Sequence, residues 1–216
     1  MSTTRDTYNR IASSRYNFRH HSRFQVELEN LARRWQRGKL LNVGCAHGPD
    51  FPPFASSFEL YGVDYSPEML KLAQKYAEKY QFSVNLQEAD ACKLPYANDF
   101  FDFAIAVAVY HHLENNEGRI QALKELYRVL KPGGEAFITI WNRWQPRHWL
   151  KKKSFMRPWN TKEKTLYRYY YLFSYGELEK SVRQVGFELI KSFPESTYKF
   201  PVKMFSRNVC ILVKKA

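Results

Sequence analysis

The sequence has few cysteines and no long run of apolar residues. Its three cysteines, Cys45, Cys92 and Cys210, form no Cys-x-x-Cys pair, so neither a zinc site nor a disulfide framework is indicated, and we expect no bound metal. No apolar stretch approaches the roughly 20 residues of a membrane span. The polar N-terminus lacks the apolar core of a signal peptide. We therefore expect a protein of the reducing cytoplasm that does not associate with membranes.

Acidic residues are scarce at both ends of the chain. Lys and Arg number 34 against 21 Asp and Glu, which gives a net charge of +13. Residues 39–140 nevertheless hold more acids than bases, whereas residues 141–173 hold nine bases and one acid. The basic flanks favour a polyanionic partner, with nucleic acid as the first candidate. A merely solvated basic surface is the alternative.

Apolar runs alternate with helix signals along the middle of the chain. Strands are predicted at 39–44, 59–64, 83–88, 101–109, 135–141, 187–193 and 207–213. Helices are predicted over 5–37, from the Ser66-Pro67-Glu68 start signal onward, over 117–130 and over 174–186. The alternation predicts an α/β fold whose mostly parallel sheet is covered by helices on both faces. The length fits one domain over 1–216, decorated by a basic aromatic insertion at about 141–173.

Residues suited to a nucleoside follow the first three predicted strands, where such sheets bind ligands. The glycines and alanine of Gly44-Cys45-Ala46-His47-Gly48 let the backbone approach a ligand closely. Asp64 ends the second strand and can accept both hydroxyl hydrogens of a ribose. Asp90, between two alanines, can meet an adenine amino group. The prolines after Gly48 remove N–H donors, which disfavours a pyrophosphate.

This ordered set, over roughly residues 37–141, resembles the class I S-adenosylmethionine (SAM)-dependent methyltransferases. The resemblance implies a Rossmann-like, seven-stranded, mostly parallel sheet flanked by helices, with SAM as the cofactor. Taken singly, each piece is also explained by a plain turn or a plain acid at a strand end. The cofactor-binding residues that we predict are Asn42, Gly44, Cys45, Ala46, Gly48, Asp64, Tyr65, Ser66, Asp90, Ala91 and Ala108. The family usually has an acid where Asn42 stands, so we expect weaker contacts near the methionine amino group.

A closer resemblance covers nearly the full chain. The segment 106–113 (AVAVYHHL) is similar to the AVxHHL of the tRNA wobble-uridine methyltransferases, which esterify the carboxylate of 5-carboxymethyluridine. Residues 8–12 (YNRIA) match their YNxIA, and 167–173 (YRYYYLF) resembles their YRYYHLF. The resemblance implies the tRNA anticodon loop as substrate and a small zinc-binding activator subunit as partner. Their C-terminal RDNW is replaced by residues 206–209 (SRNV), so nucleoside recognition is expected to differ.

The resemblance also suggests roles for cationic and aromatic residues. A carboxylate nucleophile is ionised at neutral pH, so the reaction needs positioning and no general base. We predict Arg19, His111 and His112 as catalytic residues. Arg19 would orient the carboxylate, and the histidines would hold the base or ribose or line the methyl-transfer mouth. The predicted substrate-binding residues are Tyr8, Arg19, Trp141, Arg168, Tyr169 and Arg207. The structural alternatives are a plain surface arginine for Arg19, a hydrogen-bonded turn for the two histidines, and core packing for Trp141 and several of the tyrosines.

Two other functions stay open. A small-molecule methyltransferase of the quinone-biosynthesis type shares the cofactor motifs, and it would use His111 or His112 as a base for ring-carbon methylation. The basic flanks argue against it. The second is a non-enzymatic RNA-binding protein with a degenerate cofactor pocket, to which only Asn42 points.

Overall fold

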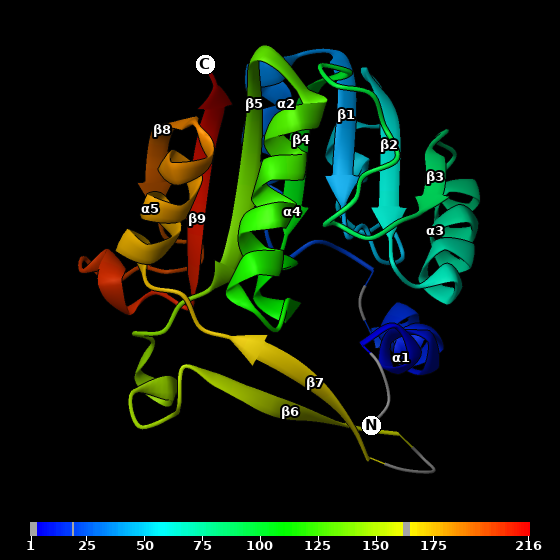
Figure 1. Ribbon diagram of the computed structural model, residues 1–216. Coiled ribbons are helices and arrows are strands. Elements are labelled where there is room, and N and C mark those ends of the chain that lie inside the picture. Colours follow the sequence, from blue (N-terminus) through cyan, green and yellow to red (C-terminus); the bar gives the residue numbers. More distant parts are fainter. Residues whose placement is uncertain (1–3, 19, 162–164) are drawn as a thin grey trace.

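The central feature of the fold is a seven-stranded sheet with the strand order β3-β2-β1-β4-β5-β9-β8 (Figure 1). The computed structural model describes residues 4–18, 20–161 and 165–216. The strands are β1 (Gly38–Val43), β2 (Phe58–Asp64), β3 (Asn85–Glu88), β4 (Phe101–Val107), β5 (Leu130–Trp141), β8 (Phe187–Phe193) and β9 (Asn208–Lys215). All pairings among β1 to β5 are parallel, and β9 runs antiparallel to both β5 and β8. The predicted mostly parallel sheet is confirmed.

Helices cover both faces of this sheet. In Figure 1, α4 (Asn116–Val129) and α5 (Tyr175–Val185) lie in front of the sheet, and α2 (Gln25–Trp35) lies behind it. Leu40 of β1 packs in the cluster that includes α2, and the next residue, Leu41, packs with α4 and α5. This burial on both faces explains why the strands are continuous apolar runs without a polar alternation. No helix of the described residues is long and apolar enough to cross a membrane.

The N-terminal region forms two helices, so the predicted continuous helix over 5–37 is wrong. The helix α1 (Thr4–Phe18) ends before α2 begins at Gln25. Between them the Ser22 hydroxyl accepts the N–H of Phe24 at 3.1 Å, a local bond that competes with helix continuation. The break places α1 below the carboxyl ends of β1 and β2 (Figure 1). Ile11 there is fully buried and packs with Met69 of α3 (Pro67–Lys79).

The insertion at 141–173 contains a second, two-stranded sheet that the sequence did not predict. The strands β6 (Ser154–Asn160) and β7 (Thr165–Tyr171) pair antiparallel, and we call them the β6–β7 ribbon. The ribbon runs beneath the main sheet towards α1 (Figure 1). Leu166 of β7 packs in the same cluster as Ile11 of α1. The ribbon and α1 therefore enclose the carboxyl ends of the central strands from two sides.

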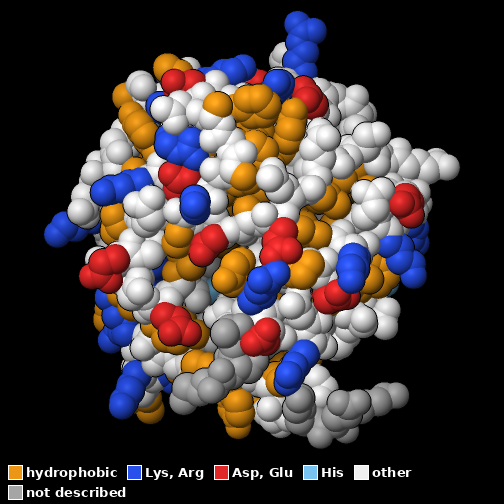
Figure 2. All heavy atoms as spheres, turned by 45° about the vertical axis from the view of Figure 1, so that its right-hand side comes forward, with side chains coloured by type: hydrophobic (Ala, Val, Ile, Leu, Met, Phe, Trp, Pro, Cys, Tyr) orange, Lys and Arg blue, Asp and Glu red, His pale blue; other side chains and the backbone are white. Residues whose placement is uncertain are grey.

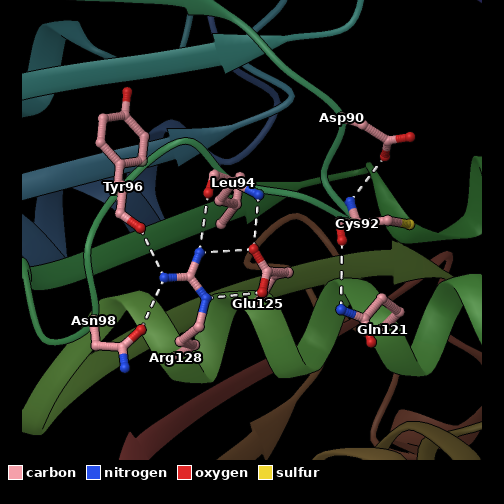
Figure 3. A network of polar contacts seen from close by, with 8 residues as sticks. All are labelled: Asp90, Cys92, Leu94, Tyr96, Asn98, Gln121, Glu125 and Arg128. Carbon is pink, nitrogen blue, oxygen red and sulfur yellow. Dashed lines mark hydrogen bonds and ion pairs between the residues drawn. The ribbon is translucent and has the colours of Figure 1, made fainter.

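A polar network ties the loop after β3 to α4 (Figure 3). Arg128 of α4 donates to the carbonyl oxygens of Leu94 at 3.0 Å and Tyr96 at 2.7 Å. Glu125, one helical turn earlier, pairs with Arg128 at 2.8 Å and accepts the N–H of Leu94 at 2.7 Å. The same loop begins with Asp90, so the network holds a predicted cofactor residue against a rigid helix.

We expect Glu125→Gln to loosen this loop and destabilise the fold. The hydrogen bond from Arg128, which outweighs the opposing effect of burial, lowers the pKa of Glu125. A carboxyl with a lowered folded-state pKa stabilises the fold above its unfolded pKa, and this contribution is lost as the pH falls through the folded pKa. Denaturant unfolding at pH 7 should show a loss of about 1–2 kcal/mol. The difference from wild type should shrink below about pH 4. The exposed Glu188→Gln is the control, and an equal loss in both variants would contradict the role of the network.

Candidate functional site

A pocket of about 280 Å³ lies at the carboxyl ends of β1, β2 and β4, beside α1. Its walls come from α1 and from the segments that follow β1, β2, β3 and β4. Of the predicted cofactor residues, the pocket is lined by Gly44, Ala46, Asp64, Tyr65, Asp90, Ala91 and Ala108, and of the other predicted residues by Tyr8 and His112. Five separate sequence segments thus converge on one cavity.

Three residues of the pocket wall have a left-handed backbone. The φ angles are 65° at Gly44, 49° at Ala46 and 60° at Ala108. Positive φ is uncommon outside glycine and concentrates at functional sites, where the surrounding structure holds the strain. A Cβ on Gly44 would lie 2.6 Å from a methyl of Val109. The two strand-end loops therefore approach each other closely and present backbone to the cavity.

Asp64 connects the loop after β1 to the start of α3. Its Oδ2 accepts the N–H of Ala46 at 2.8 Å, and its Oδ1 accepts the N–H of Ser66 at 2.9 Å. Burial raises the pKa of Asp64, and the backbone N–H donors act in the opposite direction. Each carboxylate oxygen retains acceptor capacity for one more donor. Two hydroxyls of a ribose satisfy this arrangement, so the residues present fit the nucleoside part of SAM.

Asp90 lines the pocket from the segment after β3, among apolar neighbours. Its Oδ1 accepts the N–H of Cys92 at 2.8 Å, which orients the side chain. Ala89, Ala91 and Leu113 line the pocket nearby. An apolar slot beside a carboxylate suits the ring and exocyclic amino group of an adenine.

Four predicted cofactor residues do not line the pocket. Ser66 caps α3 by accepting the N–H of Met69 at 3.2 Å, and its own N–H holds Asp64. Cys45 is buried with its N–H on the carbonyl of Val63, and Gly48 packs against Phe51. Asn42 is fully buried, and within the described part of the chain neither polar atom of its side chain has a hydrogen-bond partner. Their contact with a cofactor stays a prediction.

The two histidines after β4 occupy different environments. His112 lines the pocket; its Nε2 lies 2.8 Å from the Tyr8 hydroxyl and its Nδ1 2.9 Å from the Tyr169 carbonyl oxygen. A carbonyl only accepts, so Nδ1 carries the proton and Nε2 accepts from Tyr8. Burial lowers the pKa of His112 to about 3, so the ring is neutral at physiological pH. His111 is buried behind it and stacks on Tyr170, outside the pocket wall.

Sequence reasoning missed Arg15, which lines the pocket from α1. Its Nε is buried and has no hydrogen-bond partner among the described residues. Arg15 follows Tyr8 by seven residues, two helical turns, so both lie on one helix face. This spacing is the signal that could have found it. The predicted catalytic residue Arg19 lies outside the described residues, and its role stays a prediction.

The remaining described substrate-residue predictions, Arg168, Tyr169, Trp141 and Arg207, do not line the pocket. Arg168 is buried, with its guanidinium 4.7 Å from the ring centre of Trp159. Tyr169 contributes the carbonyl that binds His112. Trp141 packs on Tyr170 with ring centres 4.5 Å apart, and Arg207 is exposed. Within the described residues no group of His, Cys, Asp or Glu is arranged to hold a metal ion.

Comparison with known proteins agrees with this geometry. Residues 41–138 match the family described as a methyltransferase domain. Over 102 residues the chain is 37% identical to the tRNA (carboxymethyluridine(34)-5-O)-methyltransferase of Arabidopsis thaliana, covering 47% of this chain and 24% of that protein. Over 175 residues it is 31% identical to the ubiquinone/menaquinone biosynthesis C-methyltransferase UbiE of Geotalea daltonii, covering 76% of this chain and 64% of that protein.

The fold is shared with solved methyltransferases. The CcbJ methyltransferase from Streptomyces caelestis superposes with a TM-score of 0.81 at 15% identity, and the alignment covers 100% of both chains. This likeness confirms the class I methyltransferase fold. The alignment with the plant relative spans about a quarter of that protein's length.

We expect Asp64→Asn to weaken SAM binding. An asparagine places an NH₂ group against one of the two backbone N–H donors, and it loses one ribose acceptor. Hydrogen bonds to a charged group contribute about 1.5–3 kcal/mol, so the Kd should rise at least about tenfold in titration calorimetry. Asp99→Asn is the control because Asp99 pairs with Lys215 and does not line the pocket. Unchanged SAM affinity in Asp64→Asn would refute the assignment.

Proposed function

We propose that this chain, which carries a SAM-dependent methyltransferase domain with S-adenosylmethionine as its cofactor, methylates tRNA at a carboxylate oxygen of a modified wobble uridine. The proposal combines the similarity to the plant tRNA enzyme with the polar groups of the pocket. The observation that carries it is the pairing of a cation, Arg15, with a histidine that is held neutral, His112.

Arg15 places a positive charge in the pocket wall. It is the sole Lys or Arg among the described residues that line the cavity. A guanidinium binds a planar carboxylate in a forked arrangement, and the buried, unpartnered Nε of Arg15 offers one donor for it. A carboxylate substrate held there keeps its negative charge close to the cofactor.

Methyl transfer to a carboxylate needs orientation and no proton acceptor. When bound, SAM supplies an electrophilic methyl group on a sulfonium. One C–O bond forms at the carboxylate as one C–S bond breaks, so the charges cancel and no proton is released. A carboxylate is already ionised at neutral pH, so the task of the site is to align the two reactants. His112 contributes by fixing Tyr8 through its Nε2.

The same histidine argues against ring-carbon methylation of a quinone precursor. That reaction needs a base to remove a ring proton, and an efficient base has a pKa near the working pH. His112 has a pKa of about 3 and both nitrogens engaged. His111 is buried outside the pocket wall. Among the described residues, neither histidine supplies a free base to the cavity.

The proposal includes two partners. The anticodon loop of tRNA is the substrate, in keeping with the basic flanks of the sequence. A small zinc-binding activator subunit is implied by the family resemblance alone. Within the described chain, β3 is an edge strand that pairs only with β2, which leaves one row of backbone groups for another chain.

The decisive assay measures the bond that forms. The protein, alone and with a candidate zinc-binding activator, is incubated with methyl-labelled SAM and tRNA that carries carboxymethylated wobble uridine. We expect label in the tRNA that mild alkali releases, because a methyl ester hydrolyses under conditions that leave N- and C-methyl groups intact. Alkali-stable label would mean that another atom is methylated. Absence of label with normal SAM binding would sink the tRNA proposal.

The pH dependence of turnover gives a second test. With a carboxylate nucleophile and a histidine of pKa about 3, no group that titrates between pH 6 and 8 takes part. We therefore expect kcat to vary less than about twofold across this range. A tenfold fall per pH unit below about 6.5, the usual pKa of histidine, would indicate a histidine base and favour a different nucleophile. SAM binding at each pH is the control.

A further inference from the structure

Arg147 and Arg157 pack against Trp141, and the charges of Arg23 and Arg207 act on Arg147; we call these four residues the arginine cluster. The guanidinium carbons of Arg147 and Arg157 lie 4.9 Å and 4.8 Å from the ring centre of Trp141. Burial, and then the charges of Arg157, Arg207 and Arg23, lower the pKa of Arg147. Like charges repel each other, so an anion bound among these arginines would be stabilised.

No carboxylate neutralises this cluster within the part of the chain that the structure describes. None of the four arginines forms an ion pair there. The nearby buried acid, Glu195, accepts the backbone N–H groups of Arg207 and Asn208 at 3.1 Å and 2.9 Å. Arg147 donates its Nε–H to Gln145 at 2.6 Å, which orients the guanidinium. The charges are thus positioned but left unpaired.

An aromatic groove adjoins the same arginines, outside the cofactor pocket. Arg147 and Arg207 belong to its wall together with Trp149, Tyr198, Phe200 and Phe205. Trp149 is 56% exposed and Phe200 is 59% exposed. Large aromatic faces on a surface are unfavourable in water unless something covers them. We call these six residues the aromatic–arginine groove.

One class of ligand fits both the arginines and the exposed aromatic rings of this groove. Phosphates pair with unneutralised guanidinium groups, and unpaired bases stack on exposed aromatic rings. We propose that the aromatic–arginine groove binds unpaired RNA nucleotides that flank the reacting one, with phosphates on Arg147 and Arg207 and bases on Trp149 and Phe200. The inference rests on the proposed function, because it assigns where the RNA beyond the reacting nucleotide lies.

The groove is connected to the cofactor pocket by a short series of ring contacts. His112 of the pocket wall lies 4.6 Å from Tyr170, and Tyr170 lies 4.5 Å from Trp141, on which Arg147 packs. A strand whose reacting nucleotide enters the pocket therefore passes close to the groove. The face seen in Figure 2 is different, because acidic and basic side chains are interspersed there. The concave shape also suits a planar base better than a lipid surface.

The test compares two variants that lose the same charge. Binding of a fluorescent anticodon stem-loop RNA to the full chain is followed by anisotropy at several salt concentrations. Arg147→Ala/Arg207→Ala removes two groove cations, whereas Lys124→Ala/Lys180→Ala removes two exposed lysines of α4 and α5. We expect the arginine variant to bind at least about tenfold more weakly. Its slope of log K against log salt should fall by about 1.4, or 0.7 for each lost phosphate contact on a single strand. The lysine variant should change affinity less than about twofold.

Phe200→Ala tests whether RNA bases stack on the aromatic rings of the groove. It should weaken RNA binding about fivefold or more and leave the salt slope unchanged, because a stacked ring neutralises no phosphate. SAM binding should be unchanged in all three variants, since none of these residues lines the cofactor pocket.

The outcomes separate this inference from the proposed function. Equal weakening by the arginine and lysine variants would mean a diffuse positive field and would overturn the groove. Wild-type affinity in the arginine variant, with wild-type protein binding RNA, would overturn the groove and leave tRNA methylation standing. Failure of the wild-type protein to bind any RNA would overturn both. Loss of binding to anionic vesicles, without loss of RNA binding, would assign the groove to a membrane instead.

Discussion

The site depends on one carboxylate that holds two loops together. Asp64 accepts the N–H of Ala46 from the loop after β1 and the N–H of Ser66 from the start of α3. These two bonds fix the strained backbone at Ala46, and Ser66 in turn caps α3. The two bonds thereby fix the loop after β1 relative to the start of α3. The apolar residues beside Asp90 and the segment that carries His112 line the same pocket.

The helices α1 and α3 extend the same construction outwards. Ile11 and Ala12 of α1 are buried against Met69 in the first turn of α3. Ser66, which immediately precedes that turn, also donates its hydroxyl hydrogen to the Oδ1 of Asn9 at 2.6 Å. The helix that carries Tyr8 and Arg15 is therefore docked on the element that Asp64 positions. Packing and polar contacts reinforce each other at this one corner of the fold.

The sequence predicted the sheet well, and seven of the predicted cofactor residues line one pocket, because strands and strand-end loops are specified locally. Apolar runs mark strands buried on both faces, and the glycine loop and the acid at the end of β2 occupy fixed places after such strands. The break between α1 and α2 was missed because a single hydroxyl at Ser22 decides it against a favourable helical pattern. The β6–β7 ribbon was missed because charge and aromatic content obscured its alternation. Burial in β7 does alternate, with Leu166, Arg168 and Tyr170 inward. The prediction of Arg19 followed the family pattern, and Arg15 was missed because only its place on the helix face shared with Tyr8 points to it.

One imidazole makes the two walls of the pocket mechanically dependent on each other. His112 holds the Tyr8 hydroxyl of α1 at one nitrogen and the Tyr169 carbonyl of β7 at the other. A displacement of α1 large enough to admit or release a nucleoside breaks the first bond. The Nε2 of His112 then loses its hydrogen-bond partner, which costs free energy. Opening on one side is thus transmitted to the ribbon on the other.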